Sequence, residues 1–287
     1  MVALRAVWYS AVDGNSPSWW EEINDSEQWQ RGIFLALCVS YALVSFVALV
    51  QLIRIQRRVP EYGWTTQKLF HLMNFIVNGL RAILFGFYHS VFLLRSLALE
   101  TALLDLPGLL FFSTYTLLVL FWAEIYYQAR SLPINKIRPA YLIVNGAVYI
   151  IQICIWIYLQ SNPRPVAVEV AKLFLAAVSF SAAMGFLIYG GRLFFMLRSF
   201  PIESNGRRKK LNEVSLVTTI CCTCFLVRCI MVAISAFDTD ADVDVLDHPI
   251  LNFIYYMLVE ILPSALVLFI LRKLPPRRVS DQYHPIN

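Results

Sequence analysis

Three ionisable residues, Arg81, Arg228 and Glu260, lie deep inside long apolar stretches of the sequence. At about 1.5 Å per helical residue, counted from the end of each stretch that is richest in Lys and Arg, their depths are about 20 Å, about 22 Å and about 18 Å. A charge inside an apolar environment is costly, so such residues usually have a role. Because one carboxyl group and two guanidinium groups share a level, we expect Glu260 to pair with Arg228 or Arg81.

This intramembrane polar cluster has two interpretations. It can be a site that binds a ligand or a proton, or it can be a structural pin that fixes how the helices pack. A proton relay uses a chain of carboxylates or histidines. One Glu with two Arg does not provide such a chain, which favours the structural pin.

Other candidate groups in the sequence do not complete a known kind of site. The acidic stretch FDTDADVDVLDHP at 237–249 lacks the Gly and the final Glu of an EF-hand calcium loop. Cys221, Cys222 and Cys224 form the run CCTC, but no other span offers a pair of partner ligands for a metal. The sequence contains no phosphate-binding loop, no G-x-S-x-G and no HExxH. We therefore expect no metal, no cofactor and no enzymatic activity.

Membrane-spanning helices must position the polar cluster, because the composition excludes an ordinary soluble domain. The 287 residues are 59% hydrophobic and 15% charged, whereas a soluble domain is about 45–50% apolar and about 25% charged. Apolar runs of about 20 residues are typical of helices that cross a bilayer. The sequence predicts an all-α polytopic membrane protein, a bundle of seven transmembrane helices at 32–54, 68–94, 106–129, 140–160, 166–198, 213–236 and 250–272.

The distribution of Lys and Arg predicts how these spans cross the membrane. Sixteen of these residues lie on one side of the seven spans and four lie on the other. Because positive residues accumulate in cytosolic loops, we expect a lumenal N-terminus and a cytosolic C-terminus, which is a receptor-like topology. The predicted organisation is a lumenal Trp-rich tail at 1–31, a seven-span domain at 32–274 and a cytosolic tail at 275–287.

The predicted cytosolic face is strongly basic, and the run GRRKK at 206–210 is its densest part. Charge alone favours ordinary anchoring to anionic lipids. The alternative is a docking face for an acidic or nucleic-acid-bearing partner. The candidate partner-binding residues are Arg57, Arg58, Lys136, Arg138, Arg207, Arg208, Lys209 and Lys210.

Long strings throughout the chain resemble one family, the tobamovirus multiplication proteins of plants. The strings are RVPEYGWTTQKLFHLMNFIVNG (58–79), FWAEIYYQARSLPINKIRP (121–139), FLIYGGRLFFMLRSFP (186–201), GRRKKLNEV (206–214) and LDHPILNFIYYMLVEILPSALVLFILRKLPP (246–276). The resemblance implies a non-enzymatic seven-span protein of the vacuolar membrane that serves tobamoviruses as a host factor. It carries over no catalytic residues.

The resemblance also implies partners. Proteins like this one bind the helicase region of the tobamovirus replication protein and tether the viral RNA replication complex to the membrane. A small Arf-like GTPase is an associate in that setting, and direct contact with nucleic acid is not expected. Because a replication protein is cytosolic, the resemblance raises the docking interpretation of the basic face above plain lipid anchoring. A homo-oligomer stays open, since the pair Gly190–Gly191 allows close helix contact within one copy or between two.

The alternative function is a seven-helix receptor or a transporter with a polar midplane site at Arg81, Arg228 and Glu260. The number and orientation of spans fit a receptor. However, the third span ends in EIYYQAR instead of an Asp/Glu-Arg-Tyr triplet, and the seventh has no Asn-Pro-x-x-Tyr. A transporter would use broken helices around a midplane cavity, and Pro263 could break the seventh helix.

Overall fold

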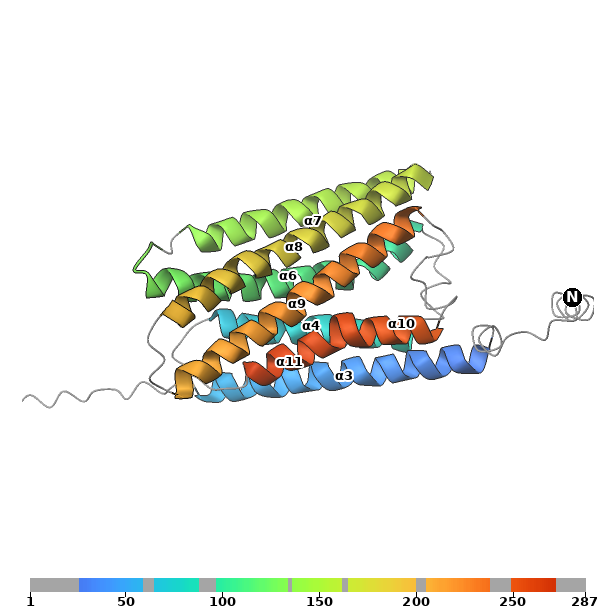
Figure 1. Cartoon of the computed structure of the whole chain (residues 1–287). Coiled ribbons are helices and arrows are strands. Elements are labelled where there is room, and N and C mark those ends of the chain that lie inside the picture. The colour runs from blue at the N-terminus through green and yellow to red at the C-terminus, as the bar shows by residue number, and fades with distance from the viewer. Residues whose placement is uncertain are drawn as a thin grey trace, which may run out of the picture.

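The computed structural model describes residues 26–58, 65–87, 97–133, 136–161, 165–199, 205–237 and 249–271, and nearly all of these residues are helical. Seven helices within these ranges are long and apolar enough to cross a bilayer. They lie side by side in one elongated bundle (Figure 1). The predicted all-α class with seven spans is therefore confirmed, and the protein is a multi-pass membrane protein.

The first span is α3, Glu27–Arg58, and the last is divided into two α-helices by a short π-helix. The other elements are α4 (Thr66–Gly86), α6 (Leu97–Ala129), α7 (Ile137–Ser161), α8 (Pro165–Ser199), α9 (Asn205–Phe237), α10 (Pro249–Tyr256), η1 (Met257–Ile261) and α11 (Leu262–Ile270). The predicted tails at 1–31 and 275–287 lie almost entirely outside the described residues.

The observed helices differ most from the predicted spans between the second and the third. Helix α4 ends at Gly86, where the N–H of Phe87 bonds the carbonyl of Ile83, and residues 88–94 of the predicted span 68–94 lie outside the described residues. Helix α6 begins at Leu97, so the predicted start at 106 is too late. The residues LALETALL before the apolar run are mostly good helix formers, and transmembrane helices accommodate an internal proline such as Pro107.

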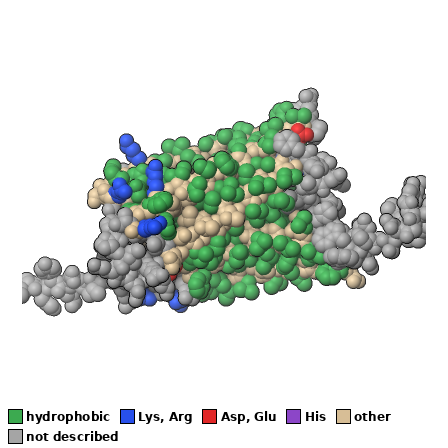
Figure 2. All heavy atoms as spheres, in the orientation of Figure 1, with side chains coloured by type: hydrophobic (Ala, Val, Ile, Leu, Met, Phe, Trp, Pro, Cys, Tyr) green, Lys and Arg blue, Asp and Glu red, His purple; other side chains and the backbone are tan. Residues whose placement is uncertain are grey.

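Helix α6 is the central helix of the bundle. It contacts α4, α7 and α8, and 67% of its spanning window is buried, against 17% for α7 on the outside. The antiparallel pairs α3–α4 and α8–α9 flank it, and the seventh span closes the bundle by contacting α3 and α9. Apolar side chains cover the middle of the face shown in Figure 2, as a lipid environment requires.

Helices α8 and α9 approach each other closely at Gly190. A methyl group added at this position would meet Thr218 of α9 and Trp122 of α6, whereas one added at Gly191 would meet open space. Small residues allow this kind of close backbone approach in membranes. The absence of a side chain at Gly190 therefore allows α8 to pack closely against α9 and α6 within this chain.

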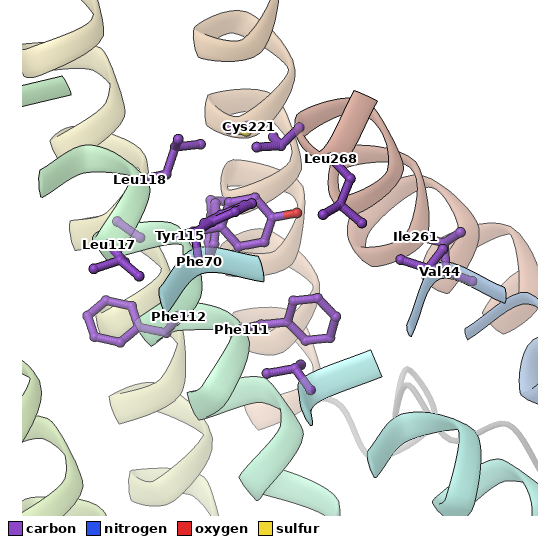
Figure 3. Packing of buried hydrophobic residues seen from close by; sticks show 14 of the residues in the cluster. Val44, Phe70, Phe111, Phe112, Tyr115, Leu117, Leu118, Cys221, Ile261 and Leu268 are labelled. Carbon is purple, nitrogen blue, oxygen red and sulfur yellow. The ribbon is translucent and has the colours of Figure 1, made fainter. Parts of the chain in front are cut away.

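Aromatic side chains interlock in the centre of the bundle (Figure 3). The ring of Tyr115 on α6 packs edge-on against Phe186 of α8 and Phe225 of α9, with centroid distances of 6.1 Å and 5.2 Å. Its hydroxyl group shares a 3.1 Å hydrogen bond with Ser264 of α11. Such edge-to-face pairs contribute about 0.5–1.5 kcal/mol beyond area burial. These contacts hold α9, which carries Arg228, and the seventh span, which carries Glu260, against α6.

Candidate functional site

Glu260 is the centre of an ion cluster that it forms with Arg81, Arg228 and Tyr41. Its Oε1 accepts hydrogen bonds from Arg81 Nη2 at 2.7 Å and Arg228 Nη1 at 2.8 Å. Its Oε2 accepts from Arg81 Nε at 3.0 Å and from the Tyr41 hydroxyl at 2.6 Å. A carboxylate has about four acceptor positions, and Glu260, which is 1% exposed, uses four. The expected pairing is present with both arginines, and Tyr41 extends the cluster to α3.

A widened helical turn carries Glu260. The π-helix Met257–Ile261 joins α10 to α11, and Pro263 follows two residues later. A proline ring clashes with the carbonyl four residues earlier, which here belongs to Val259. The wider turn lies where this clash would occur, and single π-turns of this kind are frequent at functional sites. The seventh span is thus widened at its midpoint and remains helical throughout Pro249–Ile270.

Arg81 is the last member of a polar stripe on the inner face of α4. His71, Asn74, Asn78 and Arg81 follow one another at helical spacing, and all four are buried. The polar face of this helix points inward because lipid surrounds the bundle. The Arg81 guanidinium also lies 5.1 Å from the centroid of the Tyr256 ring, which adds a cation–π attraction. The spacing of three and four residues in the sequence was the available signal for this stripe.

Arg228 reaches Glu260 alongside α6, and Gly108 provides the room. A methyl group at Gly108 would overlap the Nη2 atom of Arg228. The guanidinium group therefore lies against the backbone of α6, where any side chain at position 108 would stand.

Replacing Gly108 with Ala should lower the stability of the folded protein, although it adds only a methyl group. The Arg228 guanidinium must move, which weakens its bond to Glu260, and a hydrogen bond between charged groups contributes about 1.5–3 kcal/mol. Thermal unfolding in detergent should show a lower Tm for Gly108→Ala. The matched control is Gly146→Ala, because a methyl group there meets open space and Ala favours the helix. Equal Tm values for the two variants would contradict this role of Gly108.

Asp105 is a second acid inside the bundle, and its side chain is half-buried. Its Oδ2 accepts hydrogen bonds from Gln152 Nε2 at 3.2 Å and Trp156 Nε1 at 3.1 Å, both on α7. It lies one turn before Gly108 on the same face of α6 and interacts electrostatically with both arginines of the cluster. The predicted third span starts at 106 and so leaves Asp105 in a loop. For this reason the sequence did not identify Asp105 as a candidate residue.

The ion cluster is tightly packed. The cavity beside Glu260 and Arg228 measures about 10 Å³, which is at the lower limit for one water molecule. The carboxylate of Glu260 already has four donors. Both observations favour the structural pin over a site for a ligand.

The predicted docking residues lie at one end of the bundle, where α3, α6 and α8 end and α4, α7 and α9 begin; we call it the basic end. Arg57, Arg58, Lys136 and Arg138 are exposed, and basic side chains gather there (Figure 2). The run Arg207, Arg208, Lys209 and Lys210 lies in the first turns of α9, and the side chains of these four residues lie outside the described part of the structure. Lys68 is 3% exposed and so does not contribute to this surface.

Glu124 belongs to the basic end and not to the ion cluster. Its Oε1 accepts a 2.7 Å hydrogen bond from Arg138 Nε, and its Oε2 accepts a 3.1 Å bond from the Thr66 hydroxyl. One carboxylate therefore connects α6 with the first residues of α4 and α7.

The other candidate groups add no further site within the described residues. Cys221 is fully buried, and the Cys224 thiol donates to the carbonyl of Leu258 at 3.3 Å. The described residues contain no group of three or more His, Cys, Asp or Glu that could hold a metal ion. Residues 238–248 of the acidic stretch at 237–249 lie outside the described residues.

Comparison with known proteins shows the family. Residues 15–287 match the model of the THH1/TOM1/TOM3 domain. The chain is 68% identical over 280 residues to tobamovirus multiplication protein 1 of Nicotiana tabacum, covering 97% of each chain. It is 71% identical over 270 residues to tobamovirus multiplication protein 1 of Arabidopsis thaliana, covering 94% of this chain and 93% of the relative.

A second kind of relative is also similar. The chain is 61% identical over 270 residues to tobamovirus multiplication protein 3 of Nicotiana tabacum, covering 94% of this chain and 92% of the relative. No solved structure matches the chain. The resemblance that the sequence strings indicated is confirmed by the family model and by these relatives. This seven-span chain therefore belongs to the THH1/TOM1/TOM3 domain family of plant membrane proteins.

Proposed function

We propose that this protein is a non-enzymatic host factor of the vacuolar membrane that binds the tobamovirus replication protein through its helicase region. By this contact it tethers the viral RNA replication complex to the membrane. The names of the relatives support a part in tobamovirus multiplication and describe no reaction. In this proposal the basic end faces the cytosol, because Lys and Arg accumulate on that side of membrane proteins.

The observation that carries the proposal is the concentration of exposed positive charge at the basic end. Arg57 and Arg58 extend from the last turn of α3, and Lys136 and Arg138 lie where α7 begins. A surface of one charge sign accelerates encounter with a partner of the opposite sign. An acidic surface of the replication protein is the partner that fits this end.

The same end is proposed to meet the other partners. Anionic lipids lie beside it in the cytosolic leaflet, and a small Arf-like GTPase is a cytosolic associate implied by the family resemblance. The viral RNA is held by the replication protein, so direct contact with nucleic acid is not part of the proposal. The ion cluster around Glu260 has a structural role here, since its acceptors are occupied and the cavity beside Glu260 and Arg228 measures only about 10 Å³.

Reversing four charges at the basic end should abolish binding of the replication protein. The variant replaces Arg207, Arg208, Lys209 and Lys210 with Glu, because this run is the densest in positive charge. The readout is co-purification of a purified helicase region with the tagged membrane protein, together with the Kd measured in nanodiscs at low and high salt. We expect at least a tenfold rise in Kd, and weaker binding of the unchanged protein at high salt.

The control variant is Arg31→Glu, which reverses an exposed charge at the opposite end of α3. A glycosylation tag on the N-terminus verifies that each variant inserts in the same orientation. If the correctly inserted four-residue variant keeps full affinity, the docking surface lies elsewhere. If the unchanged protein does not bind the helicase region at all, the proposed function itself is wrong.

A further inference from the structure

We propose that Glu124 is a positioning residue, which holds Arg138 as the anchor for a carboxylate of the partner protein at the basic end. This inference rests on the proposed function and names the contact within it. Arg138 is the residue that meets the partner, and Glu124 acts through Arg138. The proposal stands on three features: the double attachment of Glu124, the free atoms of Arg138, and the place of the pair over the bundle.

Glu124 is held on both sides of its carboxylate. The Thr66 hydroxyl bonds Oε2 from the first turn of α4, and Arg138 Nε bonds Oε1 from the first turn of α7. The side chain of Glu124 is 10% exposed, so it forms part of the packed end of the bundle. The negative charge also lies close to the N-termini of two helices, where it is favourable. The carboxylate is therefore a fixed support and not a surface group of its own.

Arg138 uses only one of its three nitrogen atoms for this contact. Within the described residues, no hydrogen bond engages its Nη1 or Nη2, and its side chain is 67% exposed. Guanidinium groups bind carboxylates best with two parallel N–H donors. A guanidinium that is already held by Nε loses less freedom when it binds a second acid. Arg138 is thus prepared for a carboxylate, whereas Arg57 and Arg58 are simply exposed charges.

The position of the pair favours a protein partner over a lipid headgroup. The helix α7 lies on the outside of the bundle, but Arg138 bonds a residue of the central helix α6 that also bonds α4. Its guanidinium group is therefore drawn over the end of the bundle and away from the surrounding lipid. An acidic side chain of a protein that docks on this end can reach it directly.

The direction in which Glu124→Gln changes the Kd separates this proposal from simple charge attraction. Glu124→Gln removes a negative charge from a basic surface, so general attraction would strengthen the binding of an acidic partner or leave it unchanged. If Glu124 positions Arg138, the same change should weaken binding, and we expect a Kd about tenfold higher. Arg138→Lys should weaken binding to a similar degree, because Lys keeps the charge but lacks the fork of donors.

The test measures the Kd of the purified helicase region for the full-length protein in nanodiscs of neutral phosphatidylcholine. Arg138→Ala provides the background for a double-mutant cycle. We expect Glu124→Gln to change nothing further in that background, whereas a merely structural role of Glu124 would still lower the affinity. Arg138→Lys keeps the test decisive if Glu124→Gln folds poorly, since Arg138 is exposed.

Three outcomes would overturn the inference. Tighter or unchanged binding by Glu124→Gln, or full affinity of Arg138→Lys, would leave only general charge attraction. A further loss of affinity from Glu124→Gln in the Arg138→Ala background would make Glu124 structural. An effect that appears only in nanodiscs with anionic lipid would assign Arg138 to a lipid phosphate. In all three cases the unchanged protein still binds the helicase region, so the proposed function survives.

Discussion

Glu260→Gln should be among the most destabilising single substitutions in this protein. The change keeps the size of the side chain but removes its charge, so two buried guanidinium groups lose the acid that holds them. Removing one partner of a buried ion pair costs about 3–5 kcal/mol, because the remaining charge is left uncompensated. For a protein of this size that corresponds to a fall in Tm of about 10 °C.

Thermal unfolding in detergent, followed with a thiol-reactive fluorescent dye, measures this effect. Cys221 and Cys224 are buried, so the rise in dye signal above the background from the exposed Cys154 reports the opening of the core around the cluster. The matched control is Glu169→Gln, which removes the charge of an exposed Glu on α8 and should leave the Tm nearly unchanged. If Glu260→Gln has the same Tm as the unchanged protein, the cluster is not a structural pin.

The sequence predicted the centre of this cluster because depth in a transmembrane helix can be counted. Arg81, Arg228 and Glu260 share a level, and the bilayer leaves buried charges few partners other than one another. Tyr41 was not predicted, since a tyrosine in an apolar span has no charge that requires a partner. Gly108 was not predicted either, because its role is the space it leaves for Arg228. Such space depends on how two helices cross, and the sequence of one helix does not contain it.

The positions where the helices begin and end explain why other residues of the site were not predicted. Apolar windows place the start of the third span at 106, but helix propensity extends α6 back to Leu97. This extension brings Asp105 inside the bundle, where it meets Gln152 and Trp156. At the basic end, charge patterning identified the surface but could not show that Lys68 is buried. It also could not show that Glu124 engages Arg138, since the two residues lie on different helices.

Replacing Arg81 should lower the stability of the folded protein more than replacing Arg228. This order of stability losses distinguishes a structural pin from a ligand site. Arg81→Met removes two hydrogen bonds to Glu260 and the cation–π contact with Tyr256. Arg228→Met removes one hydrogen bond to Glu260 and leaves the two-point pair of Arg81 with Glu260 intact. Because each hydrogen bond between charged groups makes a similar contribution to stability, Arg81→Met should cost roughly twice as much as Arg228→Met.

The same dye-based Tm measurement gives this order, with Arg192→Met as the control because Arg192 is exposed at the basic end of α8. In the unchanged protein Glu260 has three charged donors, and either Met variant still leaves it one arginine. Neither change should therefore be as severe as Glu260→Gln, which leaves both cations without their acid. A ligand site gives the opposite pattern, because residues kept for binding are commonly replaced with little loss of stability, or with a gain. Equal costs for the two arginines, or a rise in Tm on removing either, would show that the hydrogen bonds to Glu260 do not hold the helices together.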